Sequence, residues 1–138
     1  GCGSLGSKIA LHLGRAGFGE MTFIDIEAMA PHNAARHALV EADMVLAPPR
    51  KAALMKSAFE KLSHDQARAL DVDAVRVFTD PGQFAAAVQE NTTLIVDTTA
   101  SLKVLASEVR SDSLTDSPAR LARLAMYGQG RCTVIILE

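Results

Sequence analysis

Residues 1–25, GCGSLGSKIALHLGRAGFGEMTFID, decide the fold class of this chain. Glycines at positions 1, 3 and 6 form the pattern G-x-G-x-x-G, and a helical pattern and a short apolar strand ending in Asp25 follow. Such a loop lets the backbone approach a phosphate, and the helix behind it offers free N–H groups and a positive dipole end. Asp25 lies 19 residues beyond Gly6, where an acid at a strand end can accept hydrogen bonds from ribose hydroxyls. The stretch predicts a nucleotide-binding loop, and a plain glycine turn beside a solvated Asp is the alternative.

Apolar periodicity predicts the other elements of the chain. The expected helices are 4–16, 50–62, 80–89 and 101–109, and the expected strands are 21–25, 72–77, 93–97 and 132–137, the last of them buried. A helical turn is expected within 31–40, a polar loop at 111–118 and a turn at 128–130, while 120–127 fits a helix or a strand. Alternating strands and helices predict a Rossmann-like α/β fold with a mainly parallel sheet and helices on both faces. A strand normally precedes such a glycine loop, so we expect the first strand to be missing and the chain to be a fragment of a longer protein.

Composition narrows the class of protein. The 138 residues suffice for one domain with a hydrophobic core, and 49% of them are hydrophobic. The formal net charge of −2 gives no field that attracts nucleic acid or anionic membranes, and an aromatic content of 4% argues against a base-stacking surface. No apolar run reaches the length of a membrane span. We therefore expect a cytoplasmic protein that binds neither nucleic acid nor membrane.

ATP and a nicotinamide dinucleotide both suit such a loop, and the segment after Asp25 indicates which of the two is expected. It contains Asn33 and Arg36 in the spacing N-x-x-R. Together with the glycine loop, this segment resembles the ThiF/MoeB/HesA superfamily of ubiquitin-activating-enzyme-like adenylyltransferases. Their pattern runs G-x-G-G-L-G-S, A-G-x-G, V-D-x-D and S-N-L-x-R-Q. Three positions depart from it: Ser4 replaces a Gly, Glu27 replaces the second Asp and His37 replaces the Gln.

The resemblance implies a role for each matching residue. It assigns the three glycines to the nucleotide loop, Asp25 to the ribose, and Asn33 and Arg36 to the ATP phosphates. The implied cofactor-binding residues are Gly1, Gly3, Gly6, Asp25, Asn33, Arg36, Lys51 and Asp97. Arg36 can hold phosphate oxygens bidentately and Lys51 can act as a mobile point charge, so these two are the expected catalytic residues. Arg50 competes with Lys51 for its role, and a solvated lysine in the first turn of a helix is an equal alternative.

A magnesium ligand is implied at the end of the strand 93–97. The family reads D-x-T-D-N there, whereas this chain reads DTTAS at 97–101, with Ala100 in the place of the second Asp. Alanine offers no oxygen to Mg²⁺, and Asp97 is the expected ligand. Three explanations remain open: Asp97 or Glu27 takes over the metal role, the chain belongs to a branch with this variant, or catalysis is lost.

Cysteine and histidine give no further site. Cys132 lies in an apolar run and is expected to be a buried, inert residue, and Cys2 is expected to be a packed filler. The residues His32, His37 and His64 have no metal-ligand spacing, and His32 and His37 are expected to pack or to be solvated.

The family resemblance thus implies an enzyme that binds MgATP and activates the C-terminal carboxylate of a small ubiquitin-like or sulfur-carrier protein as an acyl-adenylate. It also implies a homodimer or heterodimer and a single ATP-binding adenylation domain over residues 1–138. Two alternatives remain: an NAD-dependent oxidoreductase domain, which leaves Asn33 and Arg36 without a role, and a non-catalytic nucleotide-binding scaffold, which Ser4 and Ala100 favour.

Overall fold

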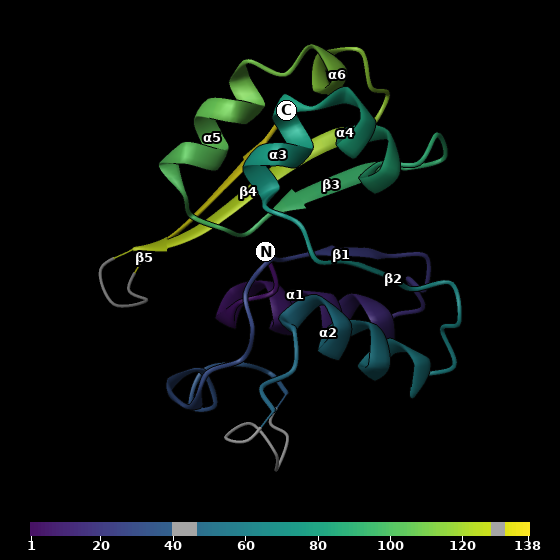
Figure 1. Ribbon diagram of the computed structural model, residues 1–138, viewed down its shortest axis with the longest axis vertical. Coiled ribbons are helices and arrows are strands. Elements are labelled where there is room, and N and C mark those ends of the chain that lie inside the picture. The colour runs from purple at the N-terminus through teal and green to yellow at the C-terminus, as the bar shows by residue number, and fades with distance from the viewer. Residues whose placement is uncertain (40–46, 128–131) are drawn as a thin grey trace. The chain divides into compact units, whose positions relative to one another are not determined.

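The computed structural model describes residues 1–39, 47–127 and 132–138 (Figure 1). The chain divides into two compact units, Gly1–Val72 and Asp73–Glu138, and each is described by itself. Among the helices that the structure describes, none combines the length and the hydrophobicity needed to span a bilayer.

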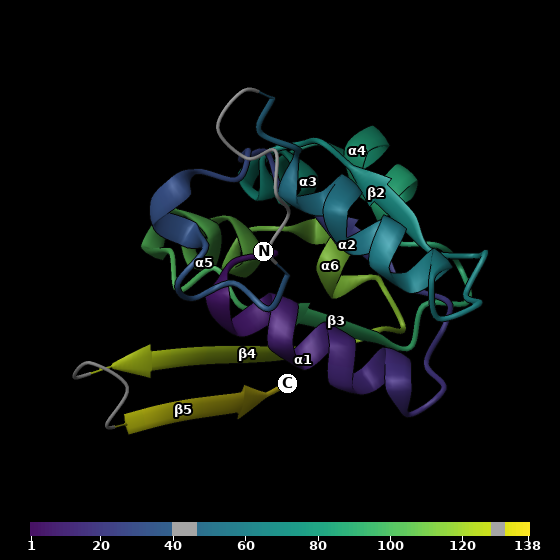
Figure 2. The ribbon, with the colours of Figure 1, turned by 90° about the horizontal axis from the view of Figure 1, so that it is seen from below.

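Unit 1 is a pair of parallel strands covered by two helices. Its elements are α1 (Ser4–Arg15), β1 (Thr22–Ile24), a 3-10 turn η1 (Pro31–Asn33), α2 (Lys51–Glu60) and β2 (Arg68–Leu70). Phe23 of β1 lies opposite Ala69 of β2. Because parallel neighbours need a crossover, α2 connects the two strands, and Figures 1 and 2 show α1 and α2 side by side along the sheet.

The core of unit 1 forms around Phe59 of α2. Phe59 and Met55 are completely buried, and the Phe59 ring meets Phe23 edge-on with a centroid distance of 4.9 Å. Gly14 of α1 makes room for this ring, since a Cβ there would lie 2.7 Å from Phe59 Cζ. The missing side chain lets α1 pack closely on α2, which fixes the start of α1 relative to the end of β1.

Unit 2 combines a three-stranded sheet with four short helices. The elements are α3 (Ala74–Thr79), α4 (Pro81–Ala87), β3 (Leu94–Asp97), α5 (Leu102–Val109), α6 (Asp112–Thr115), β4 (Arg120–Tyr127) and β5 (Cys132–Leu137). The sheet has the order β3-β4-β5, parallel between β3 and β4 and antiparallel between β4 and β5. A side chain caps the start of each helix: Asp73, Asp80, Ser101 and Ser111 each accept from a first-turn N–H group.

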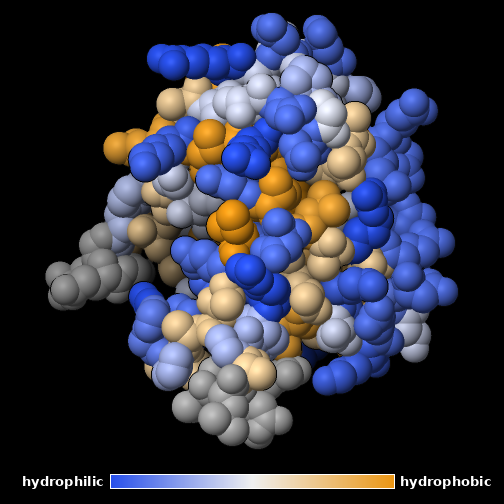
Figure 3. All heavy atoms as spheres, viewed as in Figure 1, coloured by the Kyte–Doolittle hydropathy of each residue, from blue (hydrophilic) through white to orange (hydrophobic). Residues whose placement is uncertain are grey.

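An ion cluster joins α5, β4 and the end of the chain within unit 2. Arg123 Nε donates to Glu108 Oε2 at 2.6 Å, and Arg123 Nη1 donates to Glu138 Oε1. Glu108 is 2% exposed, and its Oε1 has no hydrogen-bond partner. By contrast, Leu102 and Val109 at the two ends of α5 are exposed, and Figure 3 shows hydrophobic atoms over this helix.

The expected α/β fold with parallel strands is confirmed, and 93–97 forms a strand as predicted. The predicted strand 72–77 is wrong, because Asp73 accepts from Val75 N–H at 2.9 Å and starts α3, while the strand lies earlier, at β2. The predicted polar loop 111–118 contains the short helix α6, and the ambiguous segment 120–127 is β4. The predicted turn at 128–130 lies outside the described residues.

The last predicted strand forms, but its predicted burial is wrong. All six residues of β5 are exposed, including Cys132. Within its unit β5 is bonded to β4 along one edge, and an apolar run is buried only where another layer covers its faces.

Candidate functional site

The start of α1 forms one wall of a pocket in unit 1. Gly3 precedes the helix in extended conformation and has no side chain with which to cap it. A Cβ on Gly3 would meet no atom within 4 Å, so the fold itself leaves space there. The N–H groups at a helix start carry partial positive charge, which favours an anion.

Asp25 fixes the glycine loop to the end of β1. Its Oδ2 accepts from Cys2 N–H at 2.7 Å, and its Oδ1 accepts from Glu27 N–H at 2.8 Å. Both carboxylate oxygens therefore hold backbone of unit 1. This bracing role is one that the sequence pattern, which indicates a ribose acceptor, does not reveal.

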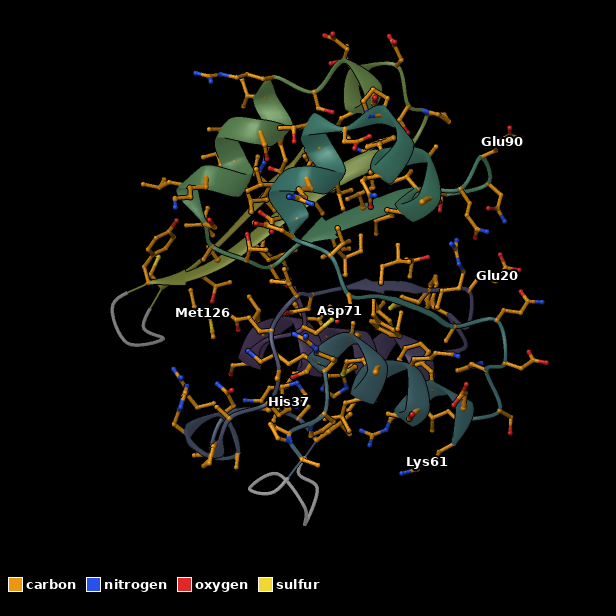
Figure 4. All side chains as sticks on the ribbon, in the orientation of Figure 1. Glu20, His37, Lys61, Asp71, Glu90 and Met126 are labelled. Carbon is orange, nitrogen blue, oxygen red and sulfur yellow. The ribbon has the colours of Figure 1, made fainter. Side chains whose placement is uncertain are left out.

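Three side chains around the loop hold the segment 36–39 in place. Ser4 Oγ donates to Arg36 O at 3.0 Å, and Ser7 Oγ, completely buried, accepts from Ala38 N–H at 3.1 Å. His37 is buried, its Nε2 lies 2.8 Å from Cys2 O, and its Nδ1 lies 3.0 Å from Leu39 O and 3.1 Å from Leu39 N (His37 is labelled in Figure 4). Since a carbonyl only accepts, Nε2 donates to Cys2 O. Ser4, Ser7 and His37 thus position Arg36, a role that sequence reasoning missed; the only signal was their place beside the two motifs.

Asn33 and Arg36 reach the pocket from η1 and the turn behind it. Asn33 Oδ1 accepts from Ala30 N–H at 2.9 Å, which leaves the Nδ2 donor group for a ligand. Arg36 N–H donates to Asn33 O at 2.9 Å, so the two residues belong to one hydrogen-bonded turn. Arg36 is exposed, and its guanidinium is available for an oxyanion.

Lys51 enters the pocket from the first turn of α2. Its side chain is 6% exposed and its Nζ forms an ion pair with Glu27 Oε2. The neighbouring Arg50 points elsewhere, because its guanidinium donates to Ile26 O at 2.7 Å and pairs with Asp71 Oδ2 at 3.1 Å. The alternative of a solvated lysine at position 51 is therefore wrong, and of the two cations Lys51 lines the pocket.

These groups enclose a pocket of about 310 Å³. The described residues that line it are Gly3, Ser4, Glu27, His32, Asn33, Arg36, His37 and Lys51. The structure thus brings together four of the residues expected from the sequence, Gly3, Asn33, Arg36 and Lys51. Two guanidinium or ammonium groups and a helix start face one cavity, which suits a phosphate-bearing ligand.

The other expected residues lie outside the described lining of this pocket. Gly1 and Gly6 flank it in sequence, and Asp25 braces the loop beside it. Asp97 ends β3 in unit 2, where its Oδ1 accepts from Thr99 N–H at 2.8 Å. Ala100 follows with a φ of 52°, a conformation that Asn and Asp adopt more easily than Ala.

Cys2 and His64 make internal contacts in this unit, whereas His32 is exposed. Cys2 is 4% exposed, and burial raises the pKa of its thiol to about 11, so the group is protonated and unreactive at neutral pH. His64 Nε2 lies 2.8 Å from Gly14 O and its ring stacks near Phe59. The described part of the chain contains no group of three or more His, Cys, Asp or Glu that could hold a metal ion.

Comparisons with solved structures define the fold. Over 93% of this chain and 48% of the other, the structure titled TcdA (CsdL) matches with a TM-score of 0.67 and 21% identity. E. coli MccB with ATP matches over 93% and 36%, with a TM-score of 0.64 and 18% identity. E. coli MccB with AMPCPP and MccA matches over 91% and 35%, with a TM-score of 0.65 and 17% identity. The chain thus spans about a third to a half of these proteins, and the likeness shows a shared Rossmann-like α/β fold.

The family model of the ThiF family matches residues 1–106, three quarters of the chain. This chain belongs to the ThiF family, as the resemblance in its first 39 residues indicates. A comparison with curated proteins gave no match.

Proposed function

We propose that this chain is the nucleotide-binding part of an adenylyltransferase that binds MgATP and activates the C-terminal carboxylate of a small ubiquitin-like or sulfur-carrier protein. The observation that carries the proposal is the pocket of unit 1, where Gly3, Asn33, Arg36 and Lys51 meet at the start of α1. In a chain of the ThiF family, this arrangement fits the polyphosphate of ATP. The similar MccB has been solved with ATP and with AMPCPP beside MccA, which supports a nucleotide and a small partner.

The proposed reaction transfers AMP to a carboxylate. One oxygen of the carrier's terminal carboxylate forms a bond to the α-phosphorus, and the bond from that phosphorus to the bridging oxygen breaks. The bonding electrons leave with pyrophosphate, and the acyl-adenylate remains. Arg36 and Lys51 would offset the negative charge that develops on the leaving group, and the helix start at Gly3 would orient the phosphates. The chain needs no covalent nucleophile for this step.

Magnesium would lower the charge repulsion between the phosphates and the incoming carboxylate. We propose Asp97 as its protein ligand. The carboxylate fits that role chemically, because Thr99 N–H occupies Oδ1 and leaves Oδ2 for a hard cation. Ala100 offers no second oxygen.

The proposal extends to the organisation of the protein. We propose that both units belong to a single adenylation domain, that the protein acts in the cytoplasm, and that it works as a homodimer or heterodimer. Beside the pocket, Gly1, Gly6 and Asp25 would support the nucleotide loop, with Asp25 also reaching the ribose.

ATP–pyrophosphate exchange in the full-length protein, with its candidate carrier, tests the proposal. We expect exchange with the wild type and a loss of about a hundredfold or more in Arg36→Ala and Lys51→Ala, as for other groups that stabilise transition-state charge. Arg50→Ala is the matched control, because Arg50 is bound to Asp71 outside the pocket, and it should exchange normally. ATP binding without any exchange would support the scaffold alternative instead.

A further inference from the structure

The ion pair between Lys51 and Glu27 is unequal. The Lys51 side chain is 6% exposed, whereas the Glu27 side chain is 68% exposed. Of the eight described residues that line the pocket, Glu27 alone carries a carboxylate. An anion therefore lies inside a cavity whose other charged groups suit an anionic ligand.

The main chain holds both partners of the pair at fixed positions. Lys51 N–H donates to Glu27 O at 3.0 Å, and Glu27 N–H donates to Asp25 Oδ1 at 2.8 Å. Lys51 is also confined by the first turn of α2 and by its burial. Glu27 has water on most of its side chain, so rotation of its χ angles is the movement that can open the pair at low cost.

The burial of the Lys51 ammonium group explains why it pairs with Glu27 when no ligand is bound. An ammonium group withdrawn from water is unfavourable unless an opposite charge compensates it, and Glu27 supplies that charge. A phosphate that reaches Lys51 Nζ would bring a second anion beside the Glu27 carboxylate, and like charges at contact distance repel. A phosphate at Lys51 would therefore favour the departure of the Glu27 carboxylate.

We infer that Glu27 is a displaceable counter-ion of Lys51, which weakens the binding of those ligands whose phosphates must reach Lys51 and thereby sets their affinity. This inference rests on the proposed function, since it concerns the same pocket. Polyphosphates such as ATP and pyrophosphate compete with Glu27, and adenosine does not. When pyrophosphate dissociates, Glu27 returns to Lys51, which favours product release. Glu27 thus tunes the affinity of this pocket for phosphate-bearing ligands and for pyrophosphate as the product.

Calorimetric titration of the full-length protein and of Glu27→Gln tests this, with ATP, pyrophosphate and adenosine as probes, each with and without Mg²⁺. We expect the variant to bind ATP and pyrophosphate about two to five times more tightly, which corresponds to the upper part of the range measured for partly exposed ion pairs. Adenosine affinity should not change. Glu60→Gln is the matched control, because Glu60 pairs with Lys56 on α2 at 3.4 Å and does not line the pocket, and it should change none of the three affinities.

The other results either overturn the inference or separate it from the proposed function. If Glu27→Gln bound ATP more weakly than the wild type only when Mg²⁺ is present, Glu27 would be a metal ligand. Equal changes in affinity for adenosine and ATP would mean a general effect of the substitution on the fold. Unchanged ATP and pyrophosphate affinities in a wild type that binds ATP would refute the counter-ion role and leave the proposed function standing. A wild type that does not bind ATP would refute the proposed function. In that case, tighter pyrophosphate binding by the variant would still support the inference about Glu27. If, in addition, neither protein bound pyrophosphate, the inference and the proposed function would both be refuted.

Discussion

Gly3 and Gly14 lie ten residues or so apart on the same segment, yet they are glycines for different physical reasons. At Gly3 a Cβ would point into open space, whereas at Gly14 it would meet the Phe59 ring at 2.7 Å. Both residues have helical or extended backbone with no positive φ that would demand glycine. The packing of α1 on α2 therefore requires glycine at position 14, whereas at position 3 the described structure leaves open space, where we propose that a phosphate binds.

Gly3→Ala should separate binding from stability. The added methyl group would occupy the space where a phosphate approaches the helix start, so ATP affinity should fall by about tenfold or more. The free energy of unfolding should change by about 1 kcal/mol or less, the cost of alanine in a helix-capping position. Urea denaturation and ATP titration of the same preparation measure both.

Gly14→Ala serves as the opposite control for that experiment. Overpacking against a fully buried ring should destabilise the protein by about 1–3 kcal/mol. A Gly14→Ala protein as stable as the wild type would contradict the packing of α1 and α2, and a Gly3→Ala protein that bound ATP normally would remove Gly3 from the nucleotide site.

At the scale of elements, the contact of α5 with β4 depends on a buried charge. Burial raises the pKa of Glu108 above its ordinary value, and the hydrogen bond from Arg123 opposes that rise. Arg123→Ala leaves the carboxylate buried without its cation, and we expect a loss of about 3–5 kcal/mol at neutral pH.

The pH dependence of this loss follows from the direction of the pKa shift. Without Arg123 the folded-state pKa of Glu108 rises further, so folding favours the protonated form, and stability falls as pH increases through that folded pKa. The destabilisation should be large at pH 7.5 and much smaller at pH 4.5 in urea denaturation. Arg110→Ala, at an exposed position just after α5, is the control and should show no such dependence. Equal losses at both pH values would show that Arg123 acts through packing rather than charge.

Most helices and strands could be predicted from the sequence, because their formation depends largely on residues that are close together in the chain. The glycine loop, the periodicity of α2 and the apolar strand ending at Asp97 were sufficient. The strand prediction for residues 72–77 was wrong. Apolar and polar residues alternate there as in a strand, but Asp73 caps the first turn of a helix. The exposure of β5 could not be predicted, because burial depends on what covers a strand and not on its own residues.

The sequence predicted only those residues of the candidate site that belong to motifs, namely charged or polar side chains that can bind a phosphate and glycines that let the backbone approach it. Asn33, Arg36 and Lys51 belong to motifs with a spacing, and the structure places them in one pocket. The choice of Lys51 over Arg50 needed three-dimensional contacts, namely the pair with Glu27 and the bond from Arg50 to Asp71. Ser7 and Asp25 act through backbone hydrogen bonds that no motif encodes.

At the scale of the whole molecule, the family match covers unit 1 and extends into unit 2 as far as residue 106. The described residues that line the pocket all belong to unit 1, and the proposed metal ligand Asp97 lies in unit 2. The proposed reaction therefore needs both units, whereas the proposed phosphate binding by Arg36 and Lys51 needs the first. Nucleotide binding is consequently the most direct test of the central claim, that this pocket holds the phosphates of ATP.

The measurement is a thermal-shift titration of the full-length protein and of Arg36→Ala with MgATP and, separately, with NAD. A ligand that binds only the folded state raises the unfolding midpoint with concentration. The account predicts stabilisation of the wild type by MgATP that is lost in Arg36→Ala. Stabilisation by NAD alone, equal in both proteins, would contradict it and favour an oxidoreductase domain.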